Sequence, residues 1–523
     1  MGRGTGSAAP DRQRALGASG RDVAHGTRIA RNGNRRMRLS SALMCGFAVL
    51  LAAPAVARAA PPAPAAPSEA APSGVALSGV PQTLDQALAA TYLQQPVLQA
   101  ERAKLRATDE DVPQALAGWR PTVVIAGSAG YGDGTVRSYT PLLGGWEKTQ
   151  NDRDVATGQA TITQPLYTGG RTTATVHRAT DLVMAERANL IAQEETSFTN
   201  AVNAYVGVIE SKQLLALNIN NEQVLRQQLR ATNDQFQVGE VTRTDVAQAQ
   251  AALAGAVAQR ETAEGNLQTA RATYRQIIGY APPEGLVSPQ PLSLPVVSVQ
   301  AATAMAAANN PNVVAAQFND AAAKNAVAAA IGQLLPQLSL QAQAFQLQNS
   351  SARSSMNNGY TALLNLSVPL YQGGSEYSAV RQARQTEEQQ ARLVADASRT
   401  AIQAAVNAWQ TYAAARAAAA STRLAVRANE IALVGVEREH LVGTRTTLDV
   451  LNAQQALLNS RVTLVQNLAN LVTASYAVAS AVGRLTARDL HLQVPLYDET
   501  AYYDAVRNRW FGLGDPGPHQ PGR

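Results

Sequence analysis

Two long stretches without helix-breaking residues dominate the pattern of hydrophobic and polar positions. From Arg171 to Val238 the chain has no proline and one glycine, and the same holds from Ser375 to Val442. At 1.5 Å per residue, each stretch would form a helix roughly 100 Å long. No compact domain needs a helix of that length, so the pattern predicts an extended helical protein.

A seam of small and apolar residues runs along the second long stretch. Its members step by four, three, four, four, three and four: Ile402, Val406, Trp409, Ala413, Ala417, Ala420 and Leu424. The resulting eleven-residue period, about 3.67 residues per turn, does not call for the left-handed supercoil of a strict heptad. The alanines would let neighbouring helices approach closely. An ordinary two-stranded coiled coil is the simpler alternative.

Four shorter segments alternate with a period of two, which is typical of β-strands. One face of each strand is given by Val123, Ile125, Gly127, Ala129 and Tyr131; by Gly158, Ala160, Ile162 and Gln164; by Leu338, Leu340, Ala342 and Ala344; and by Leu364, Leu366, Val368 and Leu370. The other faces are mostly polar, and loops at about 133–154 and 349–358 join the strands in pairs. Strands of about ten residues with this pattern indicate a transmembrane β-structure. A soluble four-stranded sheet is the alternative.

Four strands cannot close a membrane barrel, and an open edge in lipid would leave backbone groups without hydrogen bonds. The pattern therefore predicts an oligomer. Three copies would give twelve strands, an even number that barrels allow.

The chain is internally duplicated. Pro165-Leu166-Tyr167 followed by Thr-Gly-Gly matches Pro369-Leu370-Tyr371 followed by Gln-Gly-Gly, at an offset of 204 residues. Other pairs at that offset are Val238-Gly239 with Val442-Gly443, Asp245-Val246 with Asp449-Val450, and Gly279 with Gly483. We expect repeats at 82–280 and 300–485, a linker at 281–299, and a C-terminal segment at 486–523.

Residues 1–59 are expected to be a signal peptide, because arginines precede an apolar run from Leu43 to Val56 that ends in small residues. Met37 offers an alternative start, and a flexible Pro/Ala-rich segment would follow at 60–81. Cys45, the only cysteine, stands too early in the run for a lipid anchor. These 59 residues carry a net charge of +8, which leaves a net charge of −2 for the rest of the chain. Because the basic charge lies in the expected signal peptide, no nucleic-acid partner is expected.

The sequence offers little for catalysis. It has five histidines, no HExxH, no paired Cys/His spacing, no phosphate-binding glycine loop and no Gly-x-Ser-x-Gly. We expect neither an enzyme nor a cofactor or metal.

The segment Val442-Gly443-Thr444-Arg445, continuing through Asp449-Val450-Leu451-Asn452, together with the duplicated Pro-Leu-Tyr-x-Gly-Gly, resembles the TolC family over about 82–495. The resemblance implies a mixed α/β membrane protein: a homotrimer with a twelve-stranded β-barrel in outer-membrane lipid and a long helical coiled-coil barrel across the periplasm. It implies a passive exit duct for drugs, small molecules or proteins. Its partners would be a periplasmic adaptor and an inner-membrane pump of the RND or ABC type. A periplasmic adaptor or structural coiled-coil protein is the alternative.

The resemblance also implies how the helices stack. Helices at about 97–118 and 245–278 would lie end to end along the first long helix, and those at about 312–332 and 449–482 along the second. The linker at 281–299 and the segment after Leu485 would form an equatorial belt. From about residue 497 the tail is expected to be disordered.

The two helix-to-helix turns would form a periplasmic gate. By position, Arg445 and His440 on one hairpin would face Thr244 and Asp245 on the other. Asp449 would form a constriction ring, with Asn452 standing where the family has a second aspartate. His440 likewise replaces a tyrosine of the family. The alternative role of Thr244 and Asp245 is to cap a helix.

Overall fold

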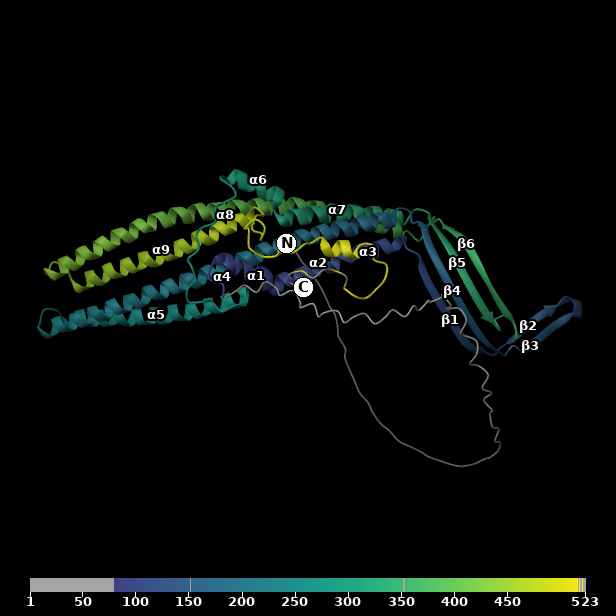
Figure 1. Ribbon diagram of the computed structural model, residues 1–523, viewed down its shortest axis with the longest axis horizontal. Coiled ribbons are helices and arrows are strands. Elements are labelled where there is room, and N and C mark those ends of the chain that lie inside the picture. Colours follow the sequence, from purple (N-terminus) through teal and green to yellow (C-terminus); the bar gives the residue numbers. More distant parts are fainter. Residues whose placement is uncertain (1–79, 151, 351–352, 516, 518–519, 521–523) are drawn as a thin grey trace, which may run out of the picture. The chain divides into compact units, whose positions relative to one another are not determined.

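The computed structural model describes residues 80–150, 152–350, 353–515, 517 and 520 (Figure 1). The predicted signal peptide, Cys45 and nearly all of the segment 60–81 lie outside the described residues. Within the described part of the chain, no helix is long and apolar enough to cross a membrane.

The two halves of the chain repeat one order of elements. In the first half the helices are α1 (Leu84–Gln94), α2 (Pro96–Asp109), α3 (Asp111–Leu116), α4 (Arg171–Gln237) and α5 (Arg243–Ile278). In the second they are α6 (Val299–Asn309), α7 (Pro311–Gly332), α8 (Ser375–Leu441) and α9 (Thr447–Ala481), and α10 (Ala501–Val506) follows. The predicted long helices are confirmed, since α4 and α8 each have 67 residues.

One predicted helix is broken in two. The segment expected to be helical at 97–118 divides at Glu110 into α2 and α3. Pro113 explains the break, because it has no N–H to donate to the carbonyl of Asp109, four residues earlier.

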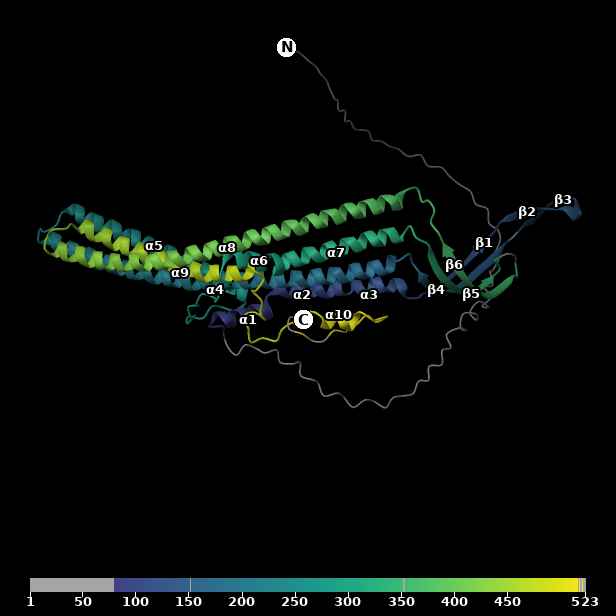
Figure 2. The same ribbon diagram turned by 90° about the horizontal axis from the view of Figure 1, so that it is seen from above.

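The long helices organise the packing. Helix α4 packs along α5 and α7, and α8 packs along α9 and α7 (Figures 1 and 2). The largest core cluster lies where α1, α2 and α9 cover α4, with Leu88, Leu98, Phe198 and Tyr205 fully buried. Helix α8 is far less covered, and Leu424 in its predicted seam is 68% exposed.

The four predicted strands form one antiparallel sheet in the order β1 (Thr122–Gly132), β4 (Arg153–Tyr167), β5 (Gln337–Gln348), β6 (Met356–Ser367). The central β4–β5 pairing joins the two halves. The register aligns Ile125, Ala160, Ala344 and Tyr360 in one row. Because directly paired residues share a face, the predicted apolar positions of the four strands collect on one side of the sheet.

Two details of the strand prediction are wrong. The stretch at 133–154 is not only a loop, since it contains a second hairpin of β2 (Thr135–Thr140) and β3 (Gly145–Gln150). The last strand is shifted towards the N-terminus, because β6 ends at Ser367 and leaves out Val368 and Leu370. Pro369 has no N–H for a ladder hydrogen bond, which accounts for the earlier end.

The prediction of disorder from about residue 497 is also wrong for the described tail. Tyr497 and Val506 are buried, and α10 packs against α2. Aromatic rings hold the segment, because the guanidinium of Arg187 lies 5.5 Å from the ring of Tyr503 and that of Arg120 lies 5.1 Å from the ring of Trp510. Such contacts stabilise a segment that has little regular structure.

Candidate functional site: the two helix turns

The α4–α5 and α8–α9 turns have the same backbone conformation. Gly239 and Gly443 adopt φ angles of +81° and +79°, which favour glycine. In both turns the next residue donates its N–H to a carbonyl five residues earlier, from Glu240 to Gln235 and from Thr444 to Glu439. The duplication therefore extends to the hydrogen bonds of the tips.

Both candidate aspartates cap their helices. Asp245 Oδ2 accepts from the N–H and the hydroxyl of Thr242 at 2.9 and 2.7 Å, while its own N–H donates to that hydroxyl oxygen. Asp449 does the same with Thr446 at 3.0 and 2.9 Å. These hydrogen bonds lower the pKa of both carboxyls. The capping partner of Asp245 is thus Thr242, and the predicted Thr244 is an exposed residue of the first helical turn.

Arg445 pairs within its own hairpin. Its Nε donates to Glu439 Oε2 at 2.8 Å, and this contact raises the pKa of Arg445. The backbone carbonyl of Arg445 lies 2.9 Å from His440 Nδ1. Glu439 was missed by the sequence analysis, because five residues and a turn separate it from Arg445.

Within a single chain, one electrostatic effect reaches from one hairpin to the other. His440 lies close enough to Asp245 to add a small lowering of the pKa of that carboxyl, after the larger contributions of Thr242. Asn452 is exposed on α9, one turn after Asp449. The ion pair at the tips thus lies within one hairpin, between Arg445 and Glu439.

A pocket lies between the hairpins above the tips. It is lined by residues of α4, α5 and α9: Asn221, Leu225, Ala252, Gly255, Ala256, Gln259, Leu451, Gln454 and Gln455. Small side chains on α5 form one wall and amides on α9 another. None of these lining side chains is ionisable.

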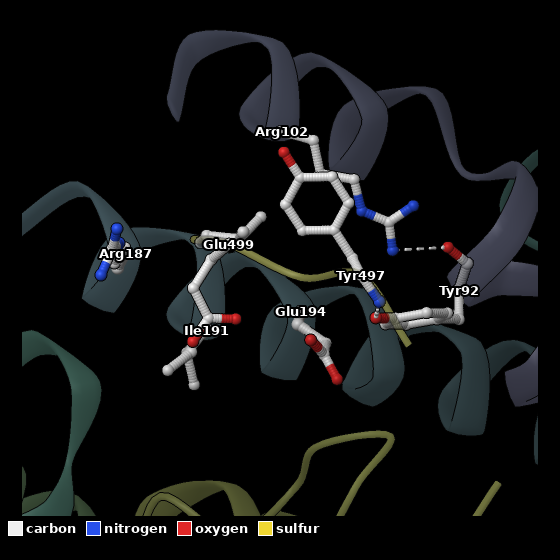
Figure 3. A pocket seen from close by; sticks show the side chains of 8 residues that line it. Tyr92, Arg102, Arg187, Ile191, Glu194, Tyr497 and Glu499 are labelled. Atoms are coloured by element: carbon white, nitrogen blue, oxygen red, sulfur yellow. Dashed lines mark hydrogen bonds between the residues drawn. The ribbon is translucent and has the colours of Figure 1, made fainter. Parts of the chain in front are cut away.

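A second cluster holds the C-terminal segment against α2 and α4. Figure 3 shows Arg102 between Tyr92 and Tyr497; its guanidinium lies 4.5 and 5.1 Å from the two ring centres, and it is 1% exposed. Arg102 donates to the carbonyl of Tyr92, and the hydroxyl of Tyr92 accepts from the N–H of Tyr497. Burial lowers the pKa of Arg102.

Two neighbouring carboxylates fasten the same segment. Glu194 accepts from the N–H of Ala487 at 2.6 Å, and Glu195 accepts from the N–H of Leu485 at 3.2 Å. Burial raises their pKa values to about 7 and about 8. Within the described residues no group of three or more His, Cys, Asp or Glu could hold a metal. The two hydrogen bonds attach the segment after Ala481 to α4.

Comparison with known proteins decides the family. A family model described as "Outer membrane efflux protein" matches residues 86–280 and 303–484, once for each half. The chain belongs to this family of TolC-like channels. This efflux protein is 36% identical over 438 residues to the outer membrane efflux protein BepC of Brucella suis, covering 83% of this chain and 92% of BepC.

More distant relatives are also outer-membrane proteins. The efflux protein is 27% identical over 319 residues to the outer membrane protein TolC of Escherichia coli, which covers 57% of this chain and 63% of TolC. Among solved structures, VceC of Vibrio cholerae has a TM-score of 0.65 at 20% identity, with 76% of this chain and 96% of that one covered. The outer-membrane channel OprN gives 0.66, also at 20% identity, with 76% and 89% covered. These likenesses show the shared fold.

The protein is therefore an outer-membrane channel of the efflux and secretion type, with a periplasmic helical barrel. Its family consists of channel proteins and is not a family of enzymes. The comparisons support the channel and not the adaptor alternative.

Proposed function

We propose that three copies of this chain form one exit duct, in which twelve strands close a β-barrel and the helices continue it through the periplasm. The observation that carries this proposal is the four-stranded sheet. Strands β1 and β6 each have one edge without a partner strand in the described residues. The apolar side of the sheet is exposed, and the side chains of Ile125, Tyr360 and Leu366 are accessible to solvent. Closing the edges with two further copies would satisfy the backbone groups in lipid.

The helices support the same assembly. The seam from Ile402 to Leu424 leaves its alanines at 413, 417 and 420 exposed along α8. A neighbouring chain that packs there would bury small side chains over several helical turns. The proposed repeats at 82–280 and 300–485 would each contribute one long helix to the barrel, and the linker at 281–299 would lie in the belt.

The exported compounds would reach the duct through partners. We propose a periplasmic adaptor whose helices fit the pocket between α5 and α9, and an inner-membrane pump of the RND or ABC type. At the tips, Arg445 and His440 would face Thr244 and Asp245 in the closed assembly, and Asp449 with Asn452 would line the constriction. The small lowering of the Asp245 pKa by His440 supports this arrangement of the hairpins.

The assembly can be tested with cysteines placed on the two edge strands. The mature chain is expected to lack cysteine, so Ile125→Cys in β1 and Leu364→Cys in β6 would be the only thiols. A bifunctional thiol reagent about 10 Å long should then yield covalent dimers and trimers in native membranes. The matched control is Ile125→Cys alone. Only monomers in the double variant, together with a monomeric mass in mild detergent, would overturn the trimer.

A further inference from the structure

The β2–β3 hairpin is an addition to the first half of the chain. It forms a two-stranded sheet of its own, and it pairs with no other strand in the described residues. In the corresponding β5–β6 connection, from 349 to 355, the described residues form no such hairpin. Nothing in the duplicated fold requires the insertion, so its surface is a candidate for binding.

One face of this hairpin combines two cations with two aromatic rings. Arg137 is paired directly with Lys148, and the next pair on that face is Tyr139 with Trp146. The rings meet edge to face with their centres 5.6 Å apart. Trp146 is 74% exposed, and Leu142 in the turn beyond it is 98% exposed.

The cation pair offers a binding site to an anion. Like charges directly opposite each other destabilise a strand pair. Both side chains are exposed, and across the described residues no carboxylate forms an ion pair with either of them. The hairpin's one acidic residue, Glu147, faces Ser138 on the opposite side. An anion bound between Arg137 and Lys148 would remove the repulsion.

The neighbouring rings indicate where that anion belongs. Tryptophan and tyrosine prefer the boundary between lipid and water, and cations near that boundary pair with lipid phosphates. The hairpin connects β1 to β4 at the ends of these strands away from α3 and α4. With the helices in the periplasm, the hairpin lies on the cell's exterior side, an orientation that rests on the proposed function.

We propose that the β2–β3 hairpin binds the phosphate groups of a glycolipid in the outer leaflet. Arg137 and Lys148 contact the phosphates, while Tyr139 and Trp146 occupy the lipid boundary. The charge-assisted contacts supply the preference for a phosphorylated lipid over a neutral one.

The test uses the full trimer, immobilised in mild detergent, and mixed micelles that carry a diphosphorylated diglucosamine lipid or its dephosphorylated form. We expect at least about tenfold weaker binding for the Arg137→Ser/Lys148→Ser variant and for the dephosphorylated lipid. Arg423→Ser/Arg427→Ser removes the same charge from α8 and should bind like the unchanged protein. Millimolar inorganic phosphate should not displace the lipid, whereas displacement would mean a site for free phosphate.

Equal binding by the hairpin variant and the unchanged protein would overturn the inference. The inference would also be overturned if the hairpin bound a protein ligand and did not bind phosphorylated lipid. Trimer mass and bilayer conductance are measured on the same preparations. A preparation that forms a conducting trimer but does not bind the lipid would contradict the lipid site and leave the proposed duct intact. Labelling of Trp146→Cys on intact cells checks the orientation independently.

Discussion

Arg445 donates to Glu439 at 2.8 Å, so the arginine of the proposed gate is already paired inside its own turn. Both side chains are about half exposed, and an exposed ion pair is a weak one. In the proposed gate, Glu439 and Asp245 would compete for the guanidinium of Arg445. The contact with Glu439 lies within a single hairpin, and the contact with Asp245 would join two. In the first half of the chain the equivalent of Glu439 is Gln235, which carries no charge.

Removing the competitor should close the duct more firmly. In Glu439→Gln the turn keeps an amide, as the first half does, but Arg445 becomes free to pair with Asp245. We predict that its single-channel open probability in planar bilayers falls by roughly two- to fivefold. Arg445→Ser should change it in the opposite direction and sensitise cells to large antibiotics. Identical behaviour of both variants would show that the pair only stabilises the turn.

Capping and gating by Asp245 can be separated. Thr242→Ala removes the hydroxyl of the helix cap but keeps the carboxylate, whereas Asp245→Asn removes the charge and keeps an acceptor oxygen. If the charge closes the gate, Asp245→Asn should raise conductance, and Thr242→Ala should leave it within about a factor of two. The readout is single-channel current. A larger rise for Thr242→Ala would assign Asp245 to capping alone.

The constriction should still bind divalent cations, although more weakly than a ring of six carboxylates. In the proposed trimer, three copies of Asp449 would place three charges around the axis, since Asn452 is neutral. We predict that millimolar Mg²⁺ on the periplasmic side reduces the current, and that Asp449→Asn abolishes this block with little change in open probability. Asn452→Asp should strengthen the block by about tenfold or more. Block that persists in Asp449→Asn would place the cation site elsewhere.

The attachment of the C-terminal segment should weaken as pH rises. Glu194 and Glu195 have pKa values of about 7 and about 8 when the segment is docked, against 4.5 ordinarily. Burial is the main cause of the raised pKa values, and the charge of Asp489 raises both further. Arg102 lowers the pKa of Glu194, and the hydrogen bond from the N–H of Leu485 lowers the pKa of Glu195. The docked state binds more protons than the released state between pH 4.5 and 8. Docking is therefore strongest in acid, weakens as the pH rises above 4.5, and levels off once both carboxyls are ionised above about pH 8.

Hydrogen exchange over residues 485–497 measures this effect. After correction for intrinsic exchange, we predict protection about tenfold or more lower at pH 8.5 than at pH 5. Glu195→Gln retains an oxygen for the N–H of Leu485 and cannot ionise, so it should flatten the dependence. Asp498→Asn is the control, because that exposed carboxyl has a lowered pKa. An unchanged slope in Glu195→Gln would contradict the assignment.

Local signals account for what the sequence could predict. The bounds of α4 and α8 follow from the absence of proline and from the glycines at each end, and the register of the sheet follows from its alternation. Contacts between distant residues were not predictable in this way. Arg102 and Tyr497 meet only once the chain has folded back over α4, so the docked tail was missed. The partner of Arg445 depends on side-chain geometry at the turn, which a motif does not contain.

A close approach at one glycine separates the two copies of the Pro-Leu-Tyr-x-Gly-Gly motif. Gly169 has φ of +64°, and a Cβ there would lie 2.5 Å from the carbonyl oxygen of Gly332 and 2.7 Å from Cβ of Leu335. Its counterpart Gly373 has φ of +68°, and no described atom lies within 4 Å of the added Cβ. The first turn is packed onto the end of α7, whereas the second is open within the chain.

Alanine at either position must adopt a left-handed conformation, which costs about 1–2 kcal/mol. Gly169→Ala must also move the end of α7, at a further cost of about 1–3 kcal/mol. We therefore predict that Gly169→Ala lowers the temperature at which the detergent-solubilised trimer dissociates more than Gly170→Ala does. Gly170, in the same turn, has φ of +78° and open space for a Cβ. Gly373→Ala should match Gly170→Ala if its turn stays open in the assembly. If both variants lower the dissociation temperature equally on a heated gel, the end of α7 moves away from the added methyl group of Gly169→Ala without a loss of stability. The turn would then not fix the strands to the helices.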